Sequence, residues 1–190
     1  MKKIETARSY YLLREAPFSP VAIFCSVHRG QPKIWRVLLS RSGASAKHLV
    51  KASFPDSIFS SCAEVGVVAD QIVAFLTGDD VRFSLDMARL DLCSRFQQKV
   101  LRAEYRIPRG SVSTYQRIAR YVGNANVARA VGAALASNPF PIIIPCHRAI
   151  RSDGALGGYQ GGLEMKRALL EMEGVLFNDK GRVLKGEFFY

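Results

Sequence analysis

The sequence has few cysteines and no long apolar run. Its four cysteines are too sparse for a disulfide scaffold and form no Cys-x-x-Cys pair, so we expect reduced thiols. No uncharged apolar stretch approaches the roughly 18–20 residues that cross a bilayer. Acidic and polar residues follow the basic start at Met1, where a signal peptide needs its apolar core. We therefore expect a soluble, cytoplasmic protein with no membrane partner.

The rest of the composition is that of a packed globular protein, with 48% apolar, 23% charged and 10% aromatic residues. A length of 190 residues allows one domain or two small ones. Cys25 and His28 have a spacing that could serve a metal ion, but one such pair without a second favours structural use. We predict no bound metal.

Acidic residues are almost absent from one stretch of the chain. Residues 95–151 carry ten basic side chains against the single acid Glu104, whereas residues 1–90 carry 12 basic and 8 acidic side chains. A stretch this one-sided repels itself unless an anionic partner compensates, and nucleic acid is the obvious candidate. General solubility is the alternative interpretation, although the clustering favours nucleic acid.

The first part of the chain, residues 1–90, has the pattern of a small α/β domain. Two β-rich runs, Val21–Val27 and Ile34–Leu39, flank a turn-like segment and predict a hairpin. Apolar residues from Glu64 to Leu76 recur at helical spacing and predict a helix. Residues 41–60 have the composition of a loop, and no element is predicted there.

The second part, residues 91–190, has the pattern of a mainly helical domain. A capping-box pattern from Ser94 to Gln97 starts a helix that ends before Pro108. Further along, Ile142–Ile144 can form a short buried strand.

Two short helices are predicted in the most basic part of the chain. Thr114 can cap a helix over Tyr115–Tyr121, and Asn126 can cap a second helix over Val127–Ala136. A tight connection between two such helices is typical of a helix-turn-helix. Arg129 is the only long side chain of the second helix, which suits close approach to another surface. A helix packed in a core has the same composition.

The segment Pro145-Cys146-His147-Arg148 places a thiol beside an imidazole and a guanidinium. Neighbouring positive charge or a hydrogen-bonded base favours the thiolate nucleophile. A loop with five glycines between positions 154 and 162 follows, and it can present backbone N–H groups to a ligand. On spacing alone, an inert buried cysteine is the alternative, since neighbouring side chains on a strand diverge.

Several motifs together favour the nucleophilic cysteine over the inert one. Ile144-Pro145-Cys146-His147-Arg148, with Tyr115, Arg129, Asn138 and the Gly-Gly-Tyr-x-Gly-Gly loop at these separations, resembles the O6-alkylguanine-DNA alkyltransferases. These proteins are also called methylated-DNA–protein-cysteine methyltransferases. The resemblance runs from about Ser94 to Gly174, whereas the first ninety residues match only in general outline.

The resemblance implies DNA repair by direct reversal. The cysteine takes the alkyl group from O6 of guanine and keeps it. Each protein molecule therefore performs only one transfer. O4-alkylthymine is a further substrate that the resemblance leaves open. By position, Cys146 is the acceptor, His147 is a base that acts through a water, and Glu173 orients the histidine. Asn138 holds the turn around the cysteine, and Tyr115 supplies a proton toward guanine N3.

The resemblance also implies a set of pocket and DNA contacts. The implied substrate pocket is formed by Pro141, Ala149, Gly157, Tyr159, Gln160 and Lys166. The implied DNA contacts are Tyr115, Ala128, Arg129, Arg148 and Ser152. Arg129 would enter the base stack after the damaged base rotates out through the minor groove. No cofactor is implied.

The fold implied by the resemblance has two domains. A ribonuclease-H-like α/β domain, with a small antiparallel sheet plus helices, would span residues 1–90. A mainly helical domain with a winged helix-turn-helix would span residues 91–190. The implied partner is double-stranded DNA containing alkylated guanine, bound by a monomer, with cooperative binding along DNA left open. The protein would be nuclear if the source is a eukaryote.

Four positions depart from the commonest pattern of these proteins: Ser111, Gln116, Ala149 and Gln160. They bear on DNA affinity and on tolerance of bulky alkyl groups more than on the reaction itself.

Three other functions are weaker fits. A non-reacting damage sensor of this type lacks the cysteine, whereas Cys146 is present. A transcription regulator of this type carries an extra cysteine-rich zinc module, which has no counterpart in this sequence. A cysteine hydrolase built on Cys146, His147 and Glu173 would leave Arg129 and the basic excess without a role.

Overall fold

The computed structural model describes residues 8–18, 20–41, 43–60, 62–184 and 188–190, so the basic start at Met1 lies outside the described residues. The chain divides into two compact units. The first contains the chain up to Ser94 together with Pro139–Ile143, and the second contains Arg95–Asn138 and Ile144–Tyr190. The boundary lies slightly later than predicted, and Pro139–Ile143 groups with the first unit rather than the second. Within the described residues, no helix has the length and apolar character needed to span a membrane.

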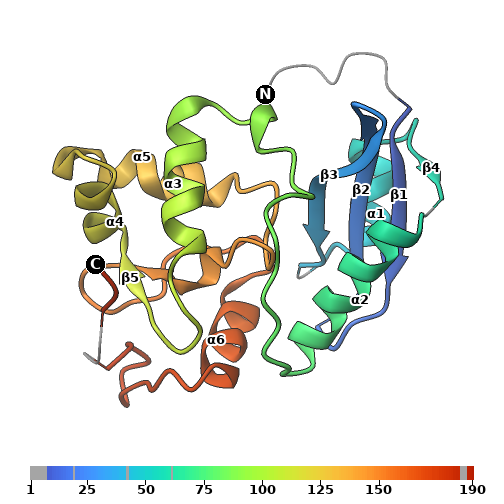
Figure 1. Cartoon of the computed structure of the whole chain (residues 1–190). Coiled ribbons are helices and arrows are strands. Elements are labelled where there is room, and N and C mark those ends of the chain that lie inside the picture. Colours follow the sequence, from blue (N-terminus) through green and yellow to red (C-terminus); the bar gives the residue numbers. More distant parts are fainter. Residues whose placement is uncertain (1–7, 19, 42, 61, 185–187) are drawn as a thin grey trace. The chain divides into compact units, whose positions relative to one another are not determined.

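The first unit is built on a four-stranded sheet with the order β3-β2-β1-β4 (Figure 1). The strands are β1 (Tyr10–Arg14), β2 (Val21–His28), β3 (Gln31–Leu39) and β4 (Ile58–Phe59). Strand β2 pairs antiparallel with β1 and β3, but β4 pairs parallel with β1. The sheet is therefore mixed, and the prediction of an antiparallel sheet was wrong for its last strand.

The predicted hairpin between β2 and β3 is confirmed. Arg29 and Gly30 form its turn, and both have positive φ, 52° and 76°. Two successive residues with positive φ match the right-handed twist of the paired strands. Because this turn is so short, β3 begins at Gln31, three residues before the predicted start.

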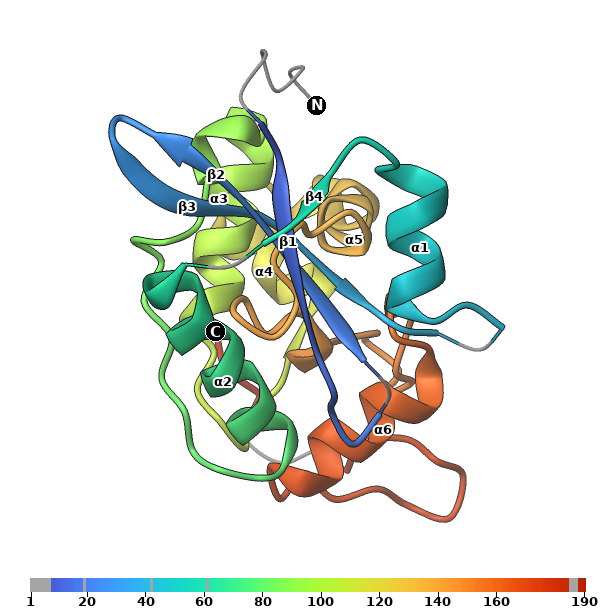
Figure 2. The same cartoon turned by 90° about the vertical axis from the view of Figure 1, so that its right-hand side faces the viewer.

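Two helices, α1 (Ala46–Ser53) and α2 (Ala63–Leu76), pack on this sheet (Figure 2). Helix α2 lies where the apolar periodicity predicts it. Helix α1 and strand β4 occupy a region for which no element was predicted. The side chain of Ser45 caps α1 by accepting a hydrogen bond from the His48 backbone N–H, so the start signal is present in the sequence.

The second unit contains four α-helices among its described residues (Figure 1). They are α3 (Arg95–Tyr105), α4 (Tyr115–Tyr121), α5 (Ala128–Ala136) and α6 (Leu163–Met172). Short 3₁₀ turns are η1 (Leu90–Leu92) in the first unit and η2 (Ala125–Val127) and η3 (Cys146–Arg148) in the second. Two-residue strands β5 (Ser113–Thr114) and β6 (Ala149–Ile150) pair in parallel.

Of the two predicted caps in the helix pair, one is confirmed and one is wrong. The Thr114 hydroxyl accepts a hydrogen bond from the Arg117 backbone N–H at 3.1 Å and caps α4. Asn126 does not cap α5. Instead, the side chain of Asn124 accepts from the Asn126 N–H at 2.9 Å, which starts the turn η2 before α5 begins. The connection between α4 and α5 is therefore partly helical.

The predicted strand over Ile142–Ile144 is also wrong. This segment is a turn, in which Ile142 has a φ of 73°. A branched residue in the left-handed region cannot continue a strand. The segment is nevertheless buried, as predicted, and the carbonyl of Pro139 accepts a hydrogen bond from the Val37 N–H of β3 at 2.7 Å.

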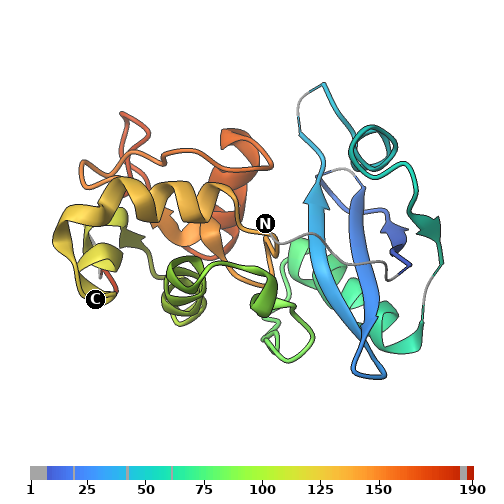
Figure 3. The ribbon, with the colours of Figure 1, turned by 90° about the horizontal axis from the view of Figure 1, so that it is seen from above.

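The C-terminal segment packs on the helical unit (Figure 3). The Phe189 N–H donates to the Val112 carbonyl at 2.8 Å, and the Ser113 hydroxyl donates to the Phe189 carbonyl at 2.7 Å. The ring of Tyr190 stacks on Tyr121 of α4 with centroids 3.9 Å apart. These contacts attach the last residues of the chain to α4 and to the strand that precedes it.

Candidate active site

Cys146 lies at the first position of the 3₁₀ turn η3, directly after Pro145. Its backbone N–H donates to the Ile144 carbonyl at 2.8 Å. The residue is only 5% exposed. Burial raises the pKa of its thiol to about 12, although a hydrogen bond with the Asn138 side chain acts in the opposite direction. The resting group is therefore a thiol: the charge of Lys166 favours the thiolate, as expected of a neighbouring cation, but desolvation outweighs it.

His147 and Glu173 meet in the interior of the second unit. The Nε2 atom of His147 is 3.0 Å from Oε1 of Glu173, and both side chains are fully buried. Burial lowers the pKa of His147, so the imidazole is neutral at neutral pH. A neutral ring that donates from Nε2 to the carboxylate has its basic lone pair on Nδ1. The structure brings together the two residues that the resemblance pairs.

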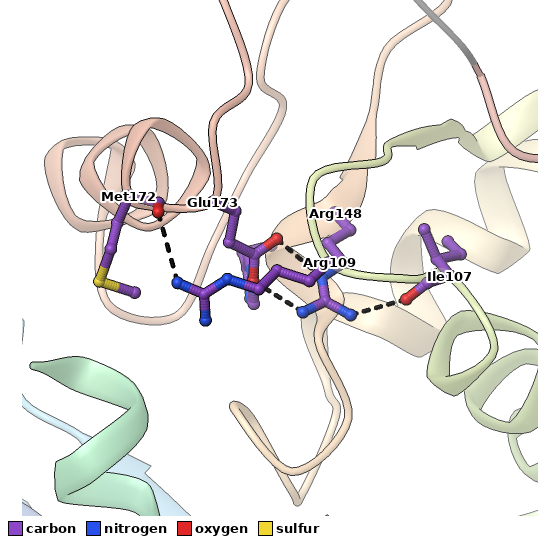
Figure 4. Close-up of polar contacts among 6 residues, drawn as sticks. Ile107, Arg109, Arg148, Met172 and Glu173 are labelled. Atoms are coloured by element: carbon purple, nitrogen blue, oxygen red, sulfur yellow. Dashed lines mark hydrogen bonds and ion pairs between the residues drawn. The ribbon is translucent and has the colours of Figure 1, made fainter. Parts of the chain in front are cut away.

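Arg148 is a third member of this buried network (Figure 4). Its guanidinium donates to both carboxylate oxygens of Glu173, at 2.9 and 2.7 Å, and to the Ile107 carbonyl at 2.6 Å. The prediction that Arg148 contacts DNA is therefore wrong, because its side chain is only 10% exposed and its charge is paired. Arg109 donates to the Met172 carbonyl at 3.4 Å at the end of α6, close to the same carboxylate (Figure 4).

The carboxyl of Glu173 stays ionised in this setting. Its burial acts to raise the pKa, but hydrogen bonds from His147 and Arg148 outweigh that effect and lower the pKa to about 2. A fixed negative charge beside the imidazole holds the ring in one tautomer and stabilises it when it accepts a proton.

Asn138 follows α5 and lies at the back of the cysteine turn. Its side chain is fully buried, and its Nδ2 donates to the Ile144 carbonyl at 3.1 Å. The amide thus links the end of α5 to the residues just before Cys146, which agrees with the position that the resemblance implies.

A cavity of about 240 Å³ opens onto the Cys146 thiol within the second unit. Its lining residues are Tyr115, Gly132, Leu135, Ala136, Cys146, Gly158, Tyr159 and Gln160. The Tyr159 hydroxyl is buried, and no hydrogen-bond partner for it is found among the described residues. Burial also raises the pKa of Tyr115 to about 12, so both phenols keep their protons at neutral pH.

Of the pocket residues implied by the resemblance, Tyr159 and Gln160 line this cavity. Gln160 donates from its side-chain amide to the Asn138 carbonyl at 2.6 Å, which ties the glycine-rich loop to the end of α5. Gly157 packs against Tyr115: a Cβ there would lie 2.6 Å from the Tyr115 hydroxyl. Pro141 belongs to the first unit and remains a prediction.

Lys166 and Ala149 take positions other than the predicted ones. The ammonium group of Lys166 is buried and donates to the carbonyls of Ala149, Leu156 and Gly158. Lys166 therefore holds the loop behind the cavity rather than lining it. The Ala149 carbonyl, which was expected to face the exocyclic amine of a base, already accepts this hydrogen bond at 2.6 Å.

A shallow groove of about 430 Å³ adjoins the cavity, since Tyr115 and Gly132 line both. The other residues of the groove are Gln116, Ala128, Arg129, Arg151, Ser152 and Asp153. Four of the predicted DNA contacts, Tyr115, Ala128, Arg129 and Ser152, therefore lie together. Arg129 and Ser152 are exposed.

Sequence reasoning did not name three residues of α5 that line the cavity: Gly132, Leu135 and Ala136. It named Gln116 only as a departure from the family pattern, whereas in the structure the Gln116 side chain donates to the Ala125 carbonyl at 2.7 Å and links α4 to the turn η2. Gly132 lines both hollows because it has no side chain, and the bare composition of its helix is the signal that could have identified it. Among the described residues, no group of three or more histidine, cysteine or acidic side chains is arranged to hold a metal ion.

Comparison with known proteins shows the family of the chain. The family model described as "6-O-methylguanine DNA methyltransferase, DNA binding domain" matches residues 95–175. A methylated-DNA–protein-cysteine methyltransferase of Methanosarcina acetivorans is 33% identical over 165 residues, which cover 87% of this chain and 98% of the relative. The chain belongs to the methylated-DNA–protein-cysteine methyltransferase family.

One relative matches a shorter part of the chain more closely, and two solved structures align with most of it. The protein of Methanothermobacter thermautotrophicus is 49% identical over 106 residues, or 56% of this chain, and the match spans only 59% of that relative's own length. A crystal structure of the Mycobacterium tuberculosis O6-methylguanine methyltransferase aligns with a TM-score of 0.69 and 33% identity, and covers 87% of this chain and 92% of that one. A crystal structure of Mycobacterium tuberculosis OGT in complex with DNA aligns equally well, with 33% identity and coverage of 87% and 93%.

Proposed function

We propose that this protein repairs DNA by moving the alkyl group of O6-alkylguanine onto Cys146, with alkylated double-stranded DNA as its partner. The observation that carries the proposal is Cys146 in the lining of a cavity, directly followed in the chain by His147 of the buried His147–Glu173 pair. Family membership and the activity for which the relatives are named support it.

The proposed chemistry is a single displacement at carbon. The Nδ1 atom of His147 takes the thiol proton through a water while sulfur bonds to the alkyl carbon. The bond between that carbon and O6 breaks, and its electron pair goes to O6. The ring accepts a proton toward N3 from Tyr115, whose raised pKa keeps the phenol protonated until then. The Tyr159 hydroxyl supplies a further donor in the cavity.

The high pKa of the thiol suits a group that must react only once. A buried thiol with a pKa of about 12 is mostly protonated and therefore reacts slowly with other electrophiles. It becomes an efficient nucleophile when a base removes its proton in the occupied site. The thioether product has no cheap hydrolysis route, so the protein is consumed, one molecule per lesion.

Access to O6 requires the base to leave the duplex. The cavity is smaller than the roughly 300–1,000 Å³ of sites for drug-sized ligands, which suits a single planar base. Rotation of the base out of the stack costs a few kcal/mol, and Arg129 on the exposed face of α5 would fill the vacated space from the minor groove. The remaining arginines would contact phosphates without reading sequence.

Finer features of the proposal rest on the resemblance. The helices α4 and α5 with the turn η2 would act as the helix-turn-helix of a winged domain, and the mixed sheet would belong to a ribonuclease-H-like unit. We expect a monomer, with cooperative binding along DNA and reaction with O4-alkylthymine as further options. The protein would work where the DNA is, in the cytoplasm or in the nucleus of a eukaryote.

The direct test is transfer from a duplex that carries radiolabelled O6-methylguanine. Label is expected to move onto the protein until one equivalent is bound and then to stop. Cys146→Ser is expected to bind the same duplex and remain unlabelled. Several turnovers per protein, or equal labelling of Cys146→Ser, would refute the proposal.

A further inference from the structure

Glu104 of α3 is a buried acid that the proposed chemistry does not use. Its side chain is 0% exposed, and neither carboxyl oxygen has a hydrogen-bond partner among the described residues. It is also the only acidic residue between positions 95 and 151. A buried carboxyl without a partner is unusual, because leaving such a group unpaired costs free energy that a substitution by an apolar residue would avoid.

The two cations whose charge reaches Glu104 are engaged elsewhere. They are Lys166 and Arg148. An ammonium group has three protons, and Lys166 donates to three backbone carbonyls. Arg148 donates to Glu173 and Ile107. Neither cation therefore forms an ion pair with Glu104.

An unpaired carboxylate in a protein interior takes up a proton rather than remain charged. Burial accordingly raises the pKa of Glu104 to about 8, so the group is a neutral acid at neutral pH. This state matters for Cys146, because a charge on Glu104 raises the pKa of the thiol whereas the charge on Lys166 lowers it. While Glu104 is neutral, the positive charge of Lys166 acts on the sulfur without opposition.

We propose that Glu104 is a positioning residue for the transfer step. As a neutral acid, Glu104 allows the charge of Lys166 to stabilise the developing Cys146 thiolate. When Glu104 ionises, its negative charge cancels that stabilisation. The proposal rests on the proposed function for its consequence in repair. The coupling between Glu104 and the thiol can be measured independently of repair.

The other charged and titratable groups around Glu104 are few. Lys166 comes from α6, Arg148 and Cys146 from η3, Tyr115 from α4 and Tyr190 from the C-terminal segment. On α5, which also packs against α3, the charged residue is Arg129, and its side chain is exposed. Both phenols have raised pKa values, so Glu104 and Lys166 are the groups that change charge near pH 8.

The test compares Glu104→Gln with the wild-type protein from pH 6.5 to pH 8, the range in which Lys166 keeps at least about half of its charge. Two rates are measured at each pH: methyl transfer from a saturating duplex with O6-methylguanine, and alkylation of Cys146 by iodoacetamide, followed by peptide mass spectrometry. The ratio of variant to wild type is expected to be near one at pH 6.5 and to rise to about two at pH 8, where about half of Glu104 is ionised, if a full charge on Glu104 changes the pKa of the thiol by about one unit, or tenfold in rate. Glu171→Gln, on the exposed part of α6, is the matched control and should keep a ratio near one throughout.

Glu104→Leu is the second variant, since it removes the charge while filling the space with an apolar side chain. It should give the same pH-dependent ratio as Glu104→Gln. A ratio that stays constant with pH in both assays would overturn the proposal and reduce Glu104 to a packing residue. If the ratio of iodoacetamide rates rises with pH but no methyl group leaves the DNA, the proposed function is refuted. The coupling between Glu104 and the Cys146 thiol is then still supported.

Discussion

Gly157 leaves the space that the Tyr115 side chain occupies. A Cβ at this position would lie 2.6 Å from the Tyr115 hydroxyl and 3.0 Å from ring atom Cε2, and the φ of Gly157 is +68°. A side chain would therefore strain the backbone and displace the phenol together. Because Tyr115 lines the cavity beside Cys146, the position of this glycine controls a group that the proposed chemistry needs.

We expect Gly157→Ala to lower the rate of methyl transfer by about tenfold or more, in the range that one misplaced proton donor costs. It should also lower the free energy of unfolding by about 1–3 kcal/mol, from the strained backbone. Gly66→Ala, on α2 of the first unit, is the matched control, because a Cβ there would meet only the Arg14 guanidinium, at 3.9 Å. Single-turnover kinetics and urea unfolding measure both effects. Equal losses in the two variants would contradict the role assigned to Gly157.

Single residues also show where sequence reasoning stops. The positions of Cys146, His147, Glu173 and Asn138 follow from the resemblance, and the structure brings them together. The contacts of Arg148 could not be predicted in this way, because its partners are Ile107 and Glu173, which are remote in sequence. A buried cation is indistinguishable from a surface one until the fold supplies the atoms around it.

At the scale of elements, helix α5 contributes residues to both the cavity and the groove. Its exposed Arg129 lies in the groove, whereas Gly132, Leu135 and Ala136 of the same helix line the cavity. A substitution at Arg129 therefore changes the groove proposed to bind DNA without altering the lining of the cavity at Cys146.

We expect Arg129→Ala to slow reaction with O6-methylguanine in a duplex by about tenfold or more, since extrusion of a base costs a few kcal/mol. Reaction with the free base O6-benzylguanine should change by less than about twofold, because no duplex has to open. Arg120→Ala replaces an exposed arginine of α4 outside the groove and serves as the control. If Arg129→Ala lost activity equally on duplex and free base, Arg129 would not be the residue that enters the stack.

The elements themselves were predictable where local signals act alone. Helix α4 was predicted from its cap at Thr114, and α2 from apolar spacing. The strand predicted over Ile142–Ile144 was wrong because β-branched residues favour a strand locally, whereas the folded chain holds Ile142 at a φ of 73°, where a strand cannot continue. Asn126 failed as a cap because Asn124, two residues earlier, already starts a helical turn.

At the scale of the whole molecule, two buried carboxyls make stability depend on pH in opposite senses. The pKa of Glu104 is raised to about 8 in the folded protein, compared with about 4.3 in the unfolded chain. The free energy of unfolding is therefore highest, as far as Glu104 is concerned, below about pH 4.3, and it falls as pH rises toward 8. The pKa of Glu173 is lowered to about 2, so its contribution is full above about 4.3 and is lost as pH falls toward 2.

We expect Glu104→Leu to be more stable than the wild-type protein, and the difference to grow between pH 4.5 and pH 8 by about 2–4 kcal/mol. The physical reason is that only the wild type must keep a proton on Glu104 as the solution becomes basic. Urea unfolding followed by circular dichroism at pH 4.5, 6 and 8 measures the difference. A difference that is the same at all three pH values would show that Glu104 does not hold its proton in the folded protein.

The central claim is that the sulfur of Cys146 receives the alkyl group. The measurement is peptide mass spectrometry of the protein after reaction with an excess of duplex that carries O6-methylguanine. The account predicts one methyl group on the peptide with Cys146 and none on the peptides with Cys25, Cys62 and Cys93. A methyl group on another cysteine, or an unmodified Cys146 after the lesion has been lost from the DNA, would contradict it.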